Sequence, residues 1–385
     1  MSELGFVPGG YADGMVATSR KQPADGADAR LEDRSYDALL VVSFGGPEGM
    51  DDVIPFLENV TRGRNIPRER LAEVGQHYEL FGGVSPINEQ NRALIAALEG
   101  ELHEHGIDLP IFFGNRNWDP YLADALREMR DAGVRRSLAF FTSAFSSYSG
   151  CRQYREDIYN AQLEVGADAP EVLKLRTFYN HPGFVEANAD RVRDALAHVP
   201  EERRTETPIV FTAHSIPMSM TAQCRYADQL AETARLVAEA VGARSHSVVY
   251  QSRSGSPHVP WLEPDVCDYL RDVKASGATD VVISPVGFVS DHVEVLYDLD
   301  VEAMEVGREI GLNVVRAGTA GTHPAYVSMI RELIEERLDD SAEQRVVGRF
   351  GPNPDVCPTN CCLPGTGKLS PWDESAETGA ASRLS

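Results

Sequence analysis

Eight short apolar runs, each followed by a polar or glycine-rich loop, constrain the fold of this chain more than any other feature. They are Asp37–Ser43, Leu109–Phe113, Arg136–Thr142, Glu171–Thr177, Pro208–Thr212, Ser247–Gln251, Asp280–Ser284 and Asn313–Arg316. Continuous apolar runs of this length are typical of strands that are buried on both faces of a parallel sheet. Helical patterns alternate with them, most clearly at Asp51–Val60, Asn88–His105, Ala222–Val241 and Ala325–Leu338. The order of strands and helices therefore predicts an α/β fold.

The runs fall into two groups of four, which predicts two similar domains with an active cleft between them. Each domain would hold a four-stranded parallel sheet flanked by helices. We place the N-terminal domain at residues 36–190 and the C-terminal domain, with its closing helix, at residues 205–340. A cysteine-containing segment follows at residues 345–365, and residues 1–35 and 366–385 have the composition of disordered ends.

Composition excludes several classes of function. The chain has 385 residues and a net charge of −23, which argues against binding of nucleic acid and against a polybasic membrane anchor. Apolar runs are too short to span a membrane, so at most peripheral membrane contact is expected. With no signal peptide evident, we expect a cytoplasmic protein, a monomer, whose six cysteines are thiols or metal ligands. The loop FGGPEG lacks the glycine order of a dinucleotide-binding motif, so NAD is not expected.

A histidine and a series of acids follow two of the predicted strands. His214 comes just after Pro208–Thr212, and Asp291, His292, Glu294, Asp298 and Glu302 come after Asp280–Ser284. Acids four residues apart lie on one helix face, where they repel each other by about 0.2–0.5 kcal/mol per pair. A bound cation would offset this repulsion, although a solvated acidic face is the plain alternative. His214 and Glu294 make a plausible pair for handling protons.

The cysteines predict a second site. Cys357, Cys361 and Cys362 lie within six residues, and Cys151 follows the polar loop after Arg136–Thr142. Four thiolates suit either a [2Fe–2S] cluster or a structural zinc ion. Cys224 and Cys267 lie in helical patterns and are expected to be packed thiols.

Several stretches, taken in order, resemble the ferrochelatase family. They are LLVVSFGGPEG, the RGR triplet at Arg62–Arg64, HYELFGGVSPI, TAHSIP, YQSRSGSPHVPWLEPDV and VGFVSDHVEVLYDLD, and they run from about Asp37 to Leu338. The resemblance implies two Rossmann-like domains of the chelatase type that insert Fe²⁺ into a porphyrin during haem biosynthesis. It also implies partners: the porphyrin, ferrous iron and the next enzyme of the haem pathway.

The same resemblance assigns roles to individual residues. His214 would accept pyrrole protons and face the metal, Glu294 would be its carboxylate partner, and both would be catalytic. Together with Asp298 and Glu302, on a π-helical segment, they would contact iron. The porphyrin would be bound by Phe44, Arg62, Tyr78, Ser85, Tyr148 and His292, with Asp291 in a supporting role.

Two features of this chain bear on the substrate. Phe44 stands where some bacterial members have a tyrosine that can approach the metal, and the segment Thr61–Ser85 lacks the apolar lip of membrane-bound relatives. The cysteine pattern is similar to that of actinobacterial members, which hold a [2Fe–2S] cluster and resemble coproporphyrin III ferrochelatases. Coproporphyrin III is therefore the expected substrate. The alternatives are protoporphyrin IX, a cobalt or nickel chelatase of the same fold, and a haem- or cluster-binding carrier.

Overall fold

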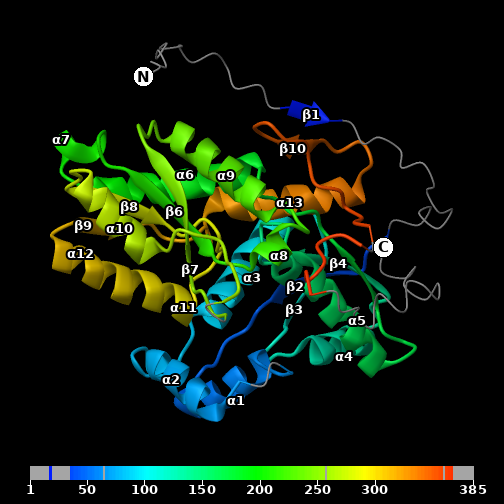
Figure 1. The fold of residues 1–385 in the computed structure, drawn as a ribbon. Helices are drawn as coiled ribbons and strands as arrows, with labels where there is room; N and C mark the ends of the chain where they lie inside the picture. Colours follow the sequence, from blue (N-terminus) through cyan, green and yellow to red (C-terminus); the bar gives the residue numbers. More distant parts are fainter. Residues whose placement is uncertain (1–16, 20–34, 64–65, 256–257, 359, 367–385) are drawn as a thin grey trace.

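The computed structural model describes residues 17–19, 35–63, 66–255, 258–358 and 360–366. Within these ranges each half of the chain forms a four-stranded parallel sheet with helices packed around it (Figure 1). The predicted α/β class with two such sheets is therefore confirmed. The segments predicted to be disordered lie almost entirely outside the described residues, but Ala17–Ser19 forms strand β1.

The first sheet is organised around β2 (Ala38–Ser43), whose six residues are all buried. β2 pairs with β3 (Ile111–Asn115) on one side and with β4 (Arg136–Phe141) on the other. β5 (Glu171–Lys174) pairs with β4, so the order is β3-β2-β4-β5. A central strand buried on both faces requires the continuous apolar sequence that predicted it.

The second sheet repeats this topology with β6 (Ile209–His214) in the place of β2. β6 lies between β7 (His246–Gln251) and β8 (Asp280–Ser284), and β9 (Asn313–Arg316) pairs with β8. In such a sheet the strand order reverses beside the first strand, and ligands bind at the carboxyl ends of the strands at that point. In this sheet the reversal lies between β6, which ends at His214, and β8, whose following loop leads to Glu294.

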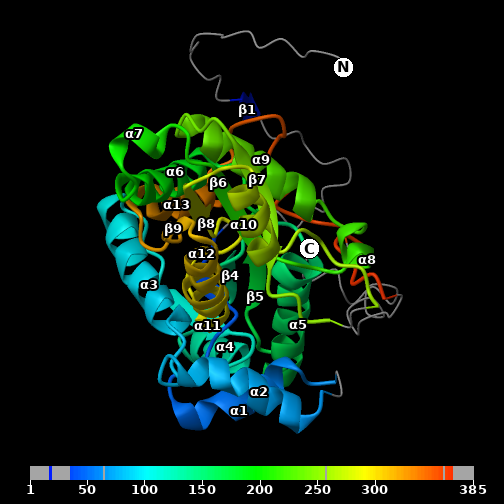
Figure 2. The same ribbon diagram turned by 60° about the vertical axis from the view of Figure 1, so that its left-hand side comes forward.

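Helices cover both sheets and fill the space between them (Figures 1 and 2). In the first half they are α1 (Met50–Val60), α2 (Arg68–Glu79), α3 (Ile87–Glu104), α4 (Leu122–Asp131), the π-helix η1 (Tyr148–Arg152), α5 (Gln153–Val165) and α6 (Pro182–Ala197). In the second half they are α7 (Glu201–Arg204), α8 (Met218–Thr221), α9 (Tyr226–Ala240), α10 (Val266–Ala275), α11 (Val293–Val295), the π-helix η2 (Leu296–Ala303), α12 (Met304–Ile310) and α13 (Pro324–Leu338). β10 (Gln344–Val346) pairs with β1 in a separate two-stranded sheet.

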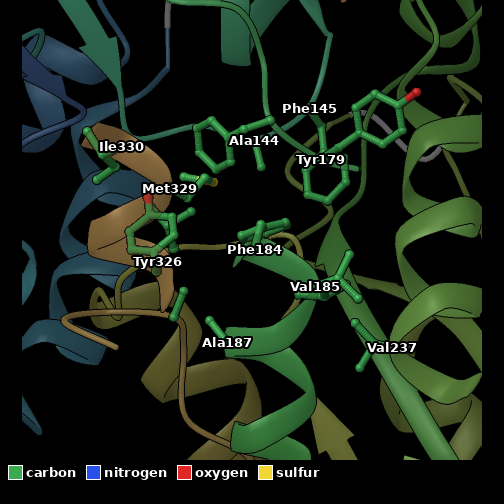
Figure 3. Packing of buried hydrophobic residues seen from close by; sticks show 14 of the residues in the cluster. Ala144, Phe145, Tyr179, Phe184, Val185, Ala187, Val237, Tyr326, Met329 and Ile330 are labelled. Atoms are coloured by element: carbon green, nitrogen blue, oxygen red, sulfur yellow. The ribbon is translucent and has the colours of Figure 1, made fainter. Parts of the chain in front are cut away.

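One hydrophobic core joins the two halves. α13, an element of the second half, packs against α3 and α6 of the first half, and buried residues of both halves belong to the same cluster. Figure 3 shows the aromatic centre of this core, where Phe184 of α6 contacts Phe145 and Tyr326, with ring centroids 6.2 and 6.1 Å apart. α6 also packs against β8, so the proposed domain boundary at residue 190 falls within a helix that supports the second sheet.

All eight predicted strands are present in the predicted order, with ends that shift by a few residues, whereas β1 and β10 were not predicted. Cys267 lies on α10 as predicted, but Cys224 lies in the turn before α9, because the helix predicted from Ala222 begins at Tyr226. None of the helices in the described ranges combines the length and the apolar composition needed to cross a membrane.

Candidate active site

His214 is the last residue of β6 and is held by its own backbone surroundings. Its Nδ1 contacts the carbonyl oxygen of Ser215, and its backbone carbonyl accepts a hydrogen bond of 3.0 Å from the hydroxyl of Tyr226. The other ring nitrogen, Nε2, lies 3.6 Å from Oε1 of Glu294. The side chains of His214 and Glu294 are 34% and 42% exposed, so this pair can be reached by a ligand.

The loop after β8 brings Glu294 to this position by crossing closely over the end of β6. Gly287 donates its amide hydrogen to the Thr212 carbonyl at 3.0 Å. A Cβ atom at Gly287 would lie 2.5 Å from the Cβ of Ala213, so a larger residue would push the loop away from the strand. The glycine of the VGF sequence is therefore required for the approach of the two site residues.

The acids after Glu294 continue along a helix of the π type. Asp298 and Glu302 lie on η2, which begins at Leu296 directly after α11, so the π-helical segment implied by the family resemblance is present. The pKa of Asp298 is influenced by the charges of both Glu294 and Glu302, which indicates that the three carboxyl groups are close neighbours. Glu294 and Asp298 are half-buried and Glu302 is exposed, so the series leads from the site toward solvent.

His214, Glu294 and Asp298 shift each other's pKa values. Burial disfavours the charged form of His214, but the charge of Glu294 and a hydrogen bond to it outweigh burial and raise the pKa of His214. Burial likewise opposes ionisation of Glu294, yet the charges of His214 and His292 lower its pKa. Burial, followed by the charge of Glu294, raises the pKa of Asp298 to about 7. The site thus holds a histidine and a carboxylate that each favour the charged form of the other, beside Asp298, whose pKa is about 7.

Two residues that sequence reasoning missed hold Asp298 in place. The Nε2 group of Gln251 donates to Asp298 Oδ2 at 3.1 Å, and the hydroxyl of Ser252 donates to the same oxygen. Ser252 adopts φ +62, a left-handed backbone conformation that is uncommon outside glycine and asparagine. The polar sequence SRSG after the predicted strand that ends at Gln251 marks a loop at the strand ends, but it does not encode these contacts.

Asp291 and His292 support the same loop. Arg316, at the end of β9, donates to Asp291 Oδ1 at 3.0 Å and to Asp300 Oδ1 at 2.6 Å. Gln90 of α3 accepts a hydrogen bond of 2.8 Å from the Asp291 amide. His292 precedes α11, where its Nδ1 accepts from the Val295 amide at 3.4 Å, and burial lowers its pKa.

Residues of the first half approach the site from the opposite side. Burial raises the pKa of Tyr78 well above its usual range, and the charge of Glu294 adds to the rise, so Tyr78 lies near that carboxylate. Phe56 packs edge-on against both Tyr78 and Phe44, with ring centroids 6.1 and 6.3 Å apart. Ser85 is buried, with its amide bonded to the Pro47 carbonyl, whereas Arg62 is exposed.

The two halves also touch directly at the site. His77 of α2 stacks on Tyr297 of η2, with ring centroids 3.6 Å apart and an interplanar angle of 6°. α2 contacts α11 as well, and both views show α1 and α2 below α11 (Figures 1 and 2). Tyr148 lies apart from this contact, on η1, where its hydroxyl donates to Glu156 Oε2 at 3.0 Å.

Cys357, Cys361 and Cys362, which are close in sequence, approach the distant Cys151 of η1. A hydrogen bond to Cys357, then burial, raises the pKa of Cys151, and hydrogen bonds to Cys151 and Cys361 lower the pKa of Cys357. Cys362 is hydrogen-bonded to Cys361. All four are free thiols. In the described part of the chain, however, no group of three or more His, Cys, Asp or Glu residues has the geometry of a metal site.

The fold has a parallel among solved structures of chelatases. A solved structure of SirB from Bacillus subtilis with Fe³⁺ aligns with 80% of this chain and 100% of its own, with a TM-score of 0.50 and 14% identity. At this level of identity the likeness is one of fold, and it places the chain in the chelatase fold class.

The sequence identifies the family within that class. The family model for ferrochelatase matches residues 36–338. Ferrochelatase from Rhodopirellula baltica is 58% identical over 85% of this chain and 93% of its own. Coproporphyrin III ferrochelatase from Streptomyces coelicolor is 52% identical over 86% of this chain and 94% of its own. The protein therefore belongs to the ferrochelatase family, and it is a metal chelatase.

Proposed function

We propose that this protein inserts Fe²⁺ into coproporphyrin III, with His214 and Glu294 as the catalytic pair. The observation that carries the proposal is the approach of His214 Nε2 to Glu294 Oε1, 3.6 Å apart and partly exposed, at the strand ends of a ferrochelatase-family fold. The choice of coproporphyrin III follows relatives such as the Streptomyces coelicolor enzyme of that name, which is 52% identical to this chain.

Metalation has to remove two N–H protons from the porphyrin and to strip water from Fe²⁺. In its neutral form the imidazole of His214 can accept a pyrrole proton, and Glu294 stabilises the imidazolium that results. Because the pKa of Asp298 is about 7, this residue can take up or release a proton near neutral pH. Glu294, Asp298 and Glu302 form a carboxylate path along η2 by which a cation can reach the pair.

The test of the pair is anaerobic metalation of coproporphyrin III by wild-type protein and by His214→Ala. We expect the variant to bind porphyrin with near wild-type affinity and to lose at least a hundredfold in rate, the low end of what a positioned acid–base group contributes, about 10²–10⁴. Arg271→Ala, which removes an exposed arginine of α10 paired with Asp268, is the control. Turnover by His214→Ala at the control rate would exclude His214 from the chemistry.

We further propose that the porphyrin lies between the two halves, against Phe44, Arg62, Tyr78, Ser85, Tyr148 and His292. The charge of Glu294 in the second half raises the pKa of Tyr78 in the first half. The two residues are therefore near each other, which supports a porphyrin site between the two halves. Arg62 is exposed, so its charge is available for a propionate of the substrate. With Phe44 at the position that a tyrosine occupies in some members of the family, the first half offers no phenol there to the metal.

Finally, we propose that Cys151, Cys357, Cys361 and Cys362 hold a [2Fe–2S] cluster. Their mutual hydrogen bonds bring four sulfur donors from two distant segments together, and soft thiolate ligands suit iron–sulfur clusters. Arg155 Nη1 donates to Cys361 Sγ at 3.6 Å, which supplies positive charge beside the thiolates. Such a cluster would provide one-electron redox chemistry and would crosslink η1 to the tail.

The cluster is tested by the colour of the protein. We expect visible absorbance in the isolated protein, bleached by dithionite, with iron and sulfide in equal amounts. Cys357→Ser should abolish the absorbance, while Cys267→Ser, which alters a thiol on α10, should retain it. A colourless protein that contains one zinc ion would favour the structural-zinc alternative.

A further inference from the structure

We propose that Arg152 and Glu156 are positioning residues that connect the cysteine loop, defined here as Cys357, Cys361 and Cys362, to Tyr148 at the porphyrin site. Through them, a change at the cysteines alters the affinity for porphyrin. This inference rests on the proposed function, because it takes Tyr148 to contact porphyrin and the cysteines to hold the cluster.

The first observation is that η1 carries residues of both sites. Tyr148 and Cys151 lie three residues apart in this π-helix of five residues. The element is braced internally, since the Ser147 side chain accepts a bond of 2.9 Å from the Gly150 amide and the Cys151 amide donates to the Ser147 carbonyl at 3.0 Å. A displacement of Cys151 therefore moves the backbone that bears Tyr148.

The second observation is a continuous hydrogen-bonded chain from the cysteine loop to the phenol. Arg152 Nη1 donates to the carbonyl of Cys361 at 3.1 Å, and Arg152 Nε donates to Glu156 Oε1 at 2.8 Å. The other carboxylate oxygen, Oε2, accepts the Tyr148 hydroxyl at 3.0 Å. Glu156 thus links Tyr148 to Arg152, and Arg152 links Glu156 to the cysteine loop.

Burial makes this series of hydrogen bonds sensitive to a displacement at either end. The side chain of Arg152 is 0% exposed and that of Glu156 is 9% exposed. A buried charged group that loses its partner leaves an uncompensated charge, so movement at one end of the chain has to be followed at the other. A buried ion pair often stabilises a fold no more than apolar residues of the same size would. Its value here is that it ties Tyr148 to a segment more than 200 residues away, since Arg152 and Cys361 are 209 apart.

The test is a double-mutant cycle on coproporphyrin III affinity, measured by fluorescence quenching without iron. The four proteins are wild type, Cys357→Ser, Glu156→Gln and the double variant, each with its visible spectrum recorded. We expect Cys357→Ser to weaken porphyrin binding about tenfold in the wild-type background and less than twofold beside Glu156→Gln. A fall from tenfold to less than twofold corresponds to a coupling of about 1 kcal/mol or more, which is within the usual range for coupled sites.

A control distinguishes coupling from loss of stability. Asp280 of β8 is a buried carboxylate that holds Arg203 by two hydrogen bonds of 2.6 and 3.1 Å, remote in sequence from η1. Asp280→Asn should leave the tenfold effect of Cys357→Ser intact. If Glu156→Gln does not fold, Tyr148→Phe breaks the same chain at its last bond and replaces it in the cycle.

Additive effects of Cys357→Ser and the η1 variants would overturn the coupling, even if the enzyme metalates porphyrin normally. An unchanged porphyrin affinity in Tyr148→Phe would overturn it too, because Tyr148 would then not contact the substrate. Failure of the proposed function would be seen in other measurements than failure of the coupling. A wild-type protein that neither binds nor metalates porphyrin refutes the proposed activity, and a colourless wild type refutes the cluster while the cycle still tests the loop.

Discussion

Asp298 shows how single residues set the chemistry of this site. Its carboxyl group lies among Glu294 and Glu302 and is partly desolvated, so its pKa is about 7 rather than near 4. Ser252 and Gln251 donate hydrogen bonds that favour the carboxylate, but they do not overcome burial and the like charge of Glu294. At neutral pH the group is therefore divided between its protonated and its ionised form.

Asp298→Asn should remove part of the pH dependence of metalation. Between about pH 6 and 8 the wild-type rate is expected to rise as Asp298 ionises, because the carboxylate attracts Fe²⁺ and accepts protons. The variant should be slower at pH 8, by about tenfold, and its rate should change less over this range. Rates measured at constant ionic strength with coproporphyrin III provide the test, and an unaltered profile would contradict it.

The pH dependence of stability tests the raised pKa of Asp298 independently. The pKa of Asp298 is higher in the folded than in the unfolded state, so the folded wild type binds more protons between about pH 4 and 7 and loses stability as pH rises there. Asp298→Asn should consequently melt at a higher temperature than wild type above pH 7, with the difference vanishing toward pH 4. A pH-independent difference in Tm would mean that the pKa is not raised.

Sequence reasoning located His214 and Glu294 because both follow strands at one end of a sheet, where parallel strands bring distant residues together. It did not find Ser252 or Arg316. The left-handed φ of Ser252 and the two hydrogen bonds of Arg316 are made by tertiary contacts, and no local pattern encodes them.

At the scale of elements, the loop after β8 and the π-helix η2 act as one unit clamped from β9. Arg316 is only 15% exposed and holds Asp291 before α11 and Asp300 on η2. Its two bonds fix the segment at points on either side of Glu294. The guanidinium suits this role because its donors have a fixed planar geometry.

Arg316→Met keeps the aliphatic stem and removes both bonds. Breaking a fully buried ion pair from one side costs about 3 kcal/mol or more, and these pairs are partly exposed, so the free energy of unfolding in urea should fall by about 1–3 kcal/mol. Metalation should slow because Glu294 is less well fixed, with a larger effect on the KM for iron than on porphyrin affinity. The double variant with Asp300→Asn should regain part of the stability, whereas no loss in the single variant would contradict the clamp.

Strands were easier to predict than the helices that shape the site. β2, β6 and β8 are buried along their whole or nearly whole length, so hydrophobicity alone marks them. η1 has only five residues, and its π geometry gives no hydrophobic period that could be recognised. Family resemblance, rather than periodicity, provided the expectation of a π-helix after Glu294.

The whole molecule consists of two similar sheets held in a fixed relation. A shared core around α13 joins them, and the site itself is bridged by the His77–Tyr297 stack and by the Gln90–Asp291 hydrogen bond. His214, Glu294 and the acids of η2 come from the second half, while Phe44, Tyr78 and Arg62 come from the first. A porphyrin between the halves would thus be contacted on one side by acid–base groups and on the other by aromatic and basic groups.

This division leads to the prediction about substrate choice. Coproporphyrin III has four propionates and protoporphyrin IX has two, so the former benefits more from cationic groups at the rim. The chain has a net charge of −23, yet four arginines fall within Thr61–Arg70, and Arg62 is exposed there. One additional charged hydrogen bond at about 1.5 kcal/mol corresponds to roughly tenfold in specificity.

We therefore expect kcat/KM for coproporphyrin III to exceed that for protoporphyrin IX by at least tenfold under the same detergent-free conditions. Arg62→Ala should reduce this ratio several-fold by lowering kcat/KM for coproporphyrin III, because it removes a propionate partner. Arg130→Ala is the matched control, since Arg130 is a surface arginine of α4 paired with its neighbour Asp131. Equal use of both porphyrins by the wild type would refute coproporphyrin III as the preferred substrate, while the His214–Glu294 pair would still account for metalation.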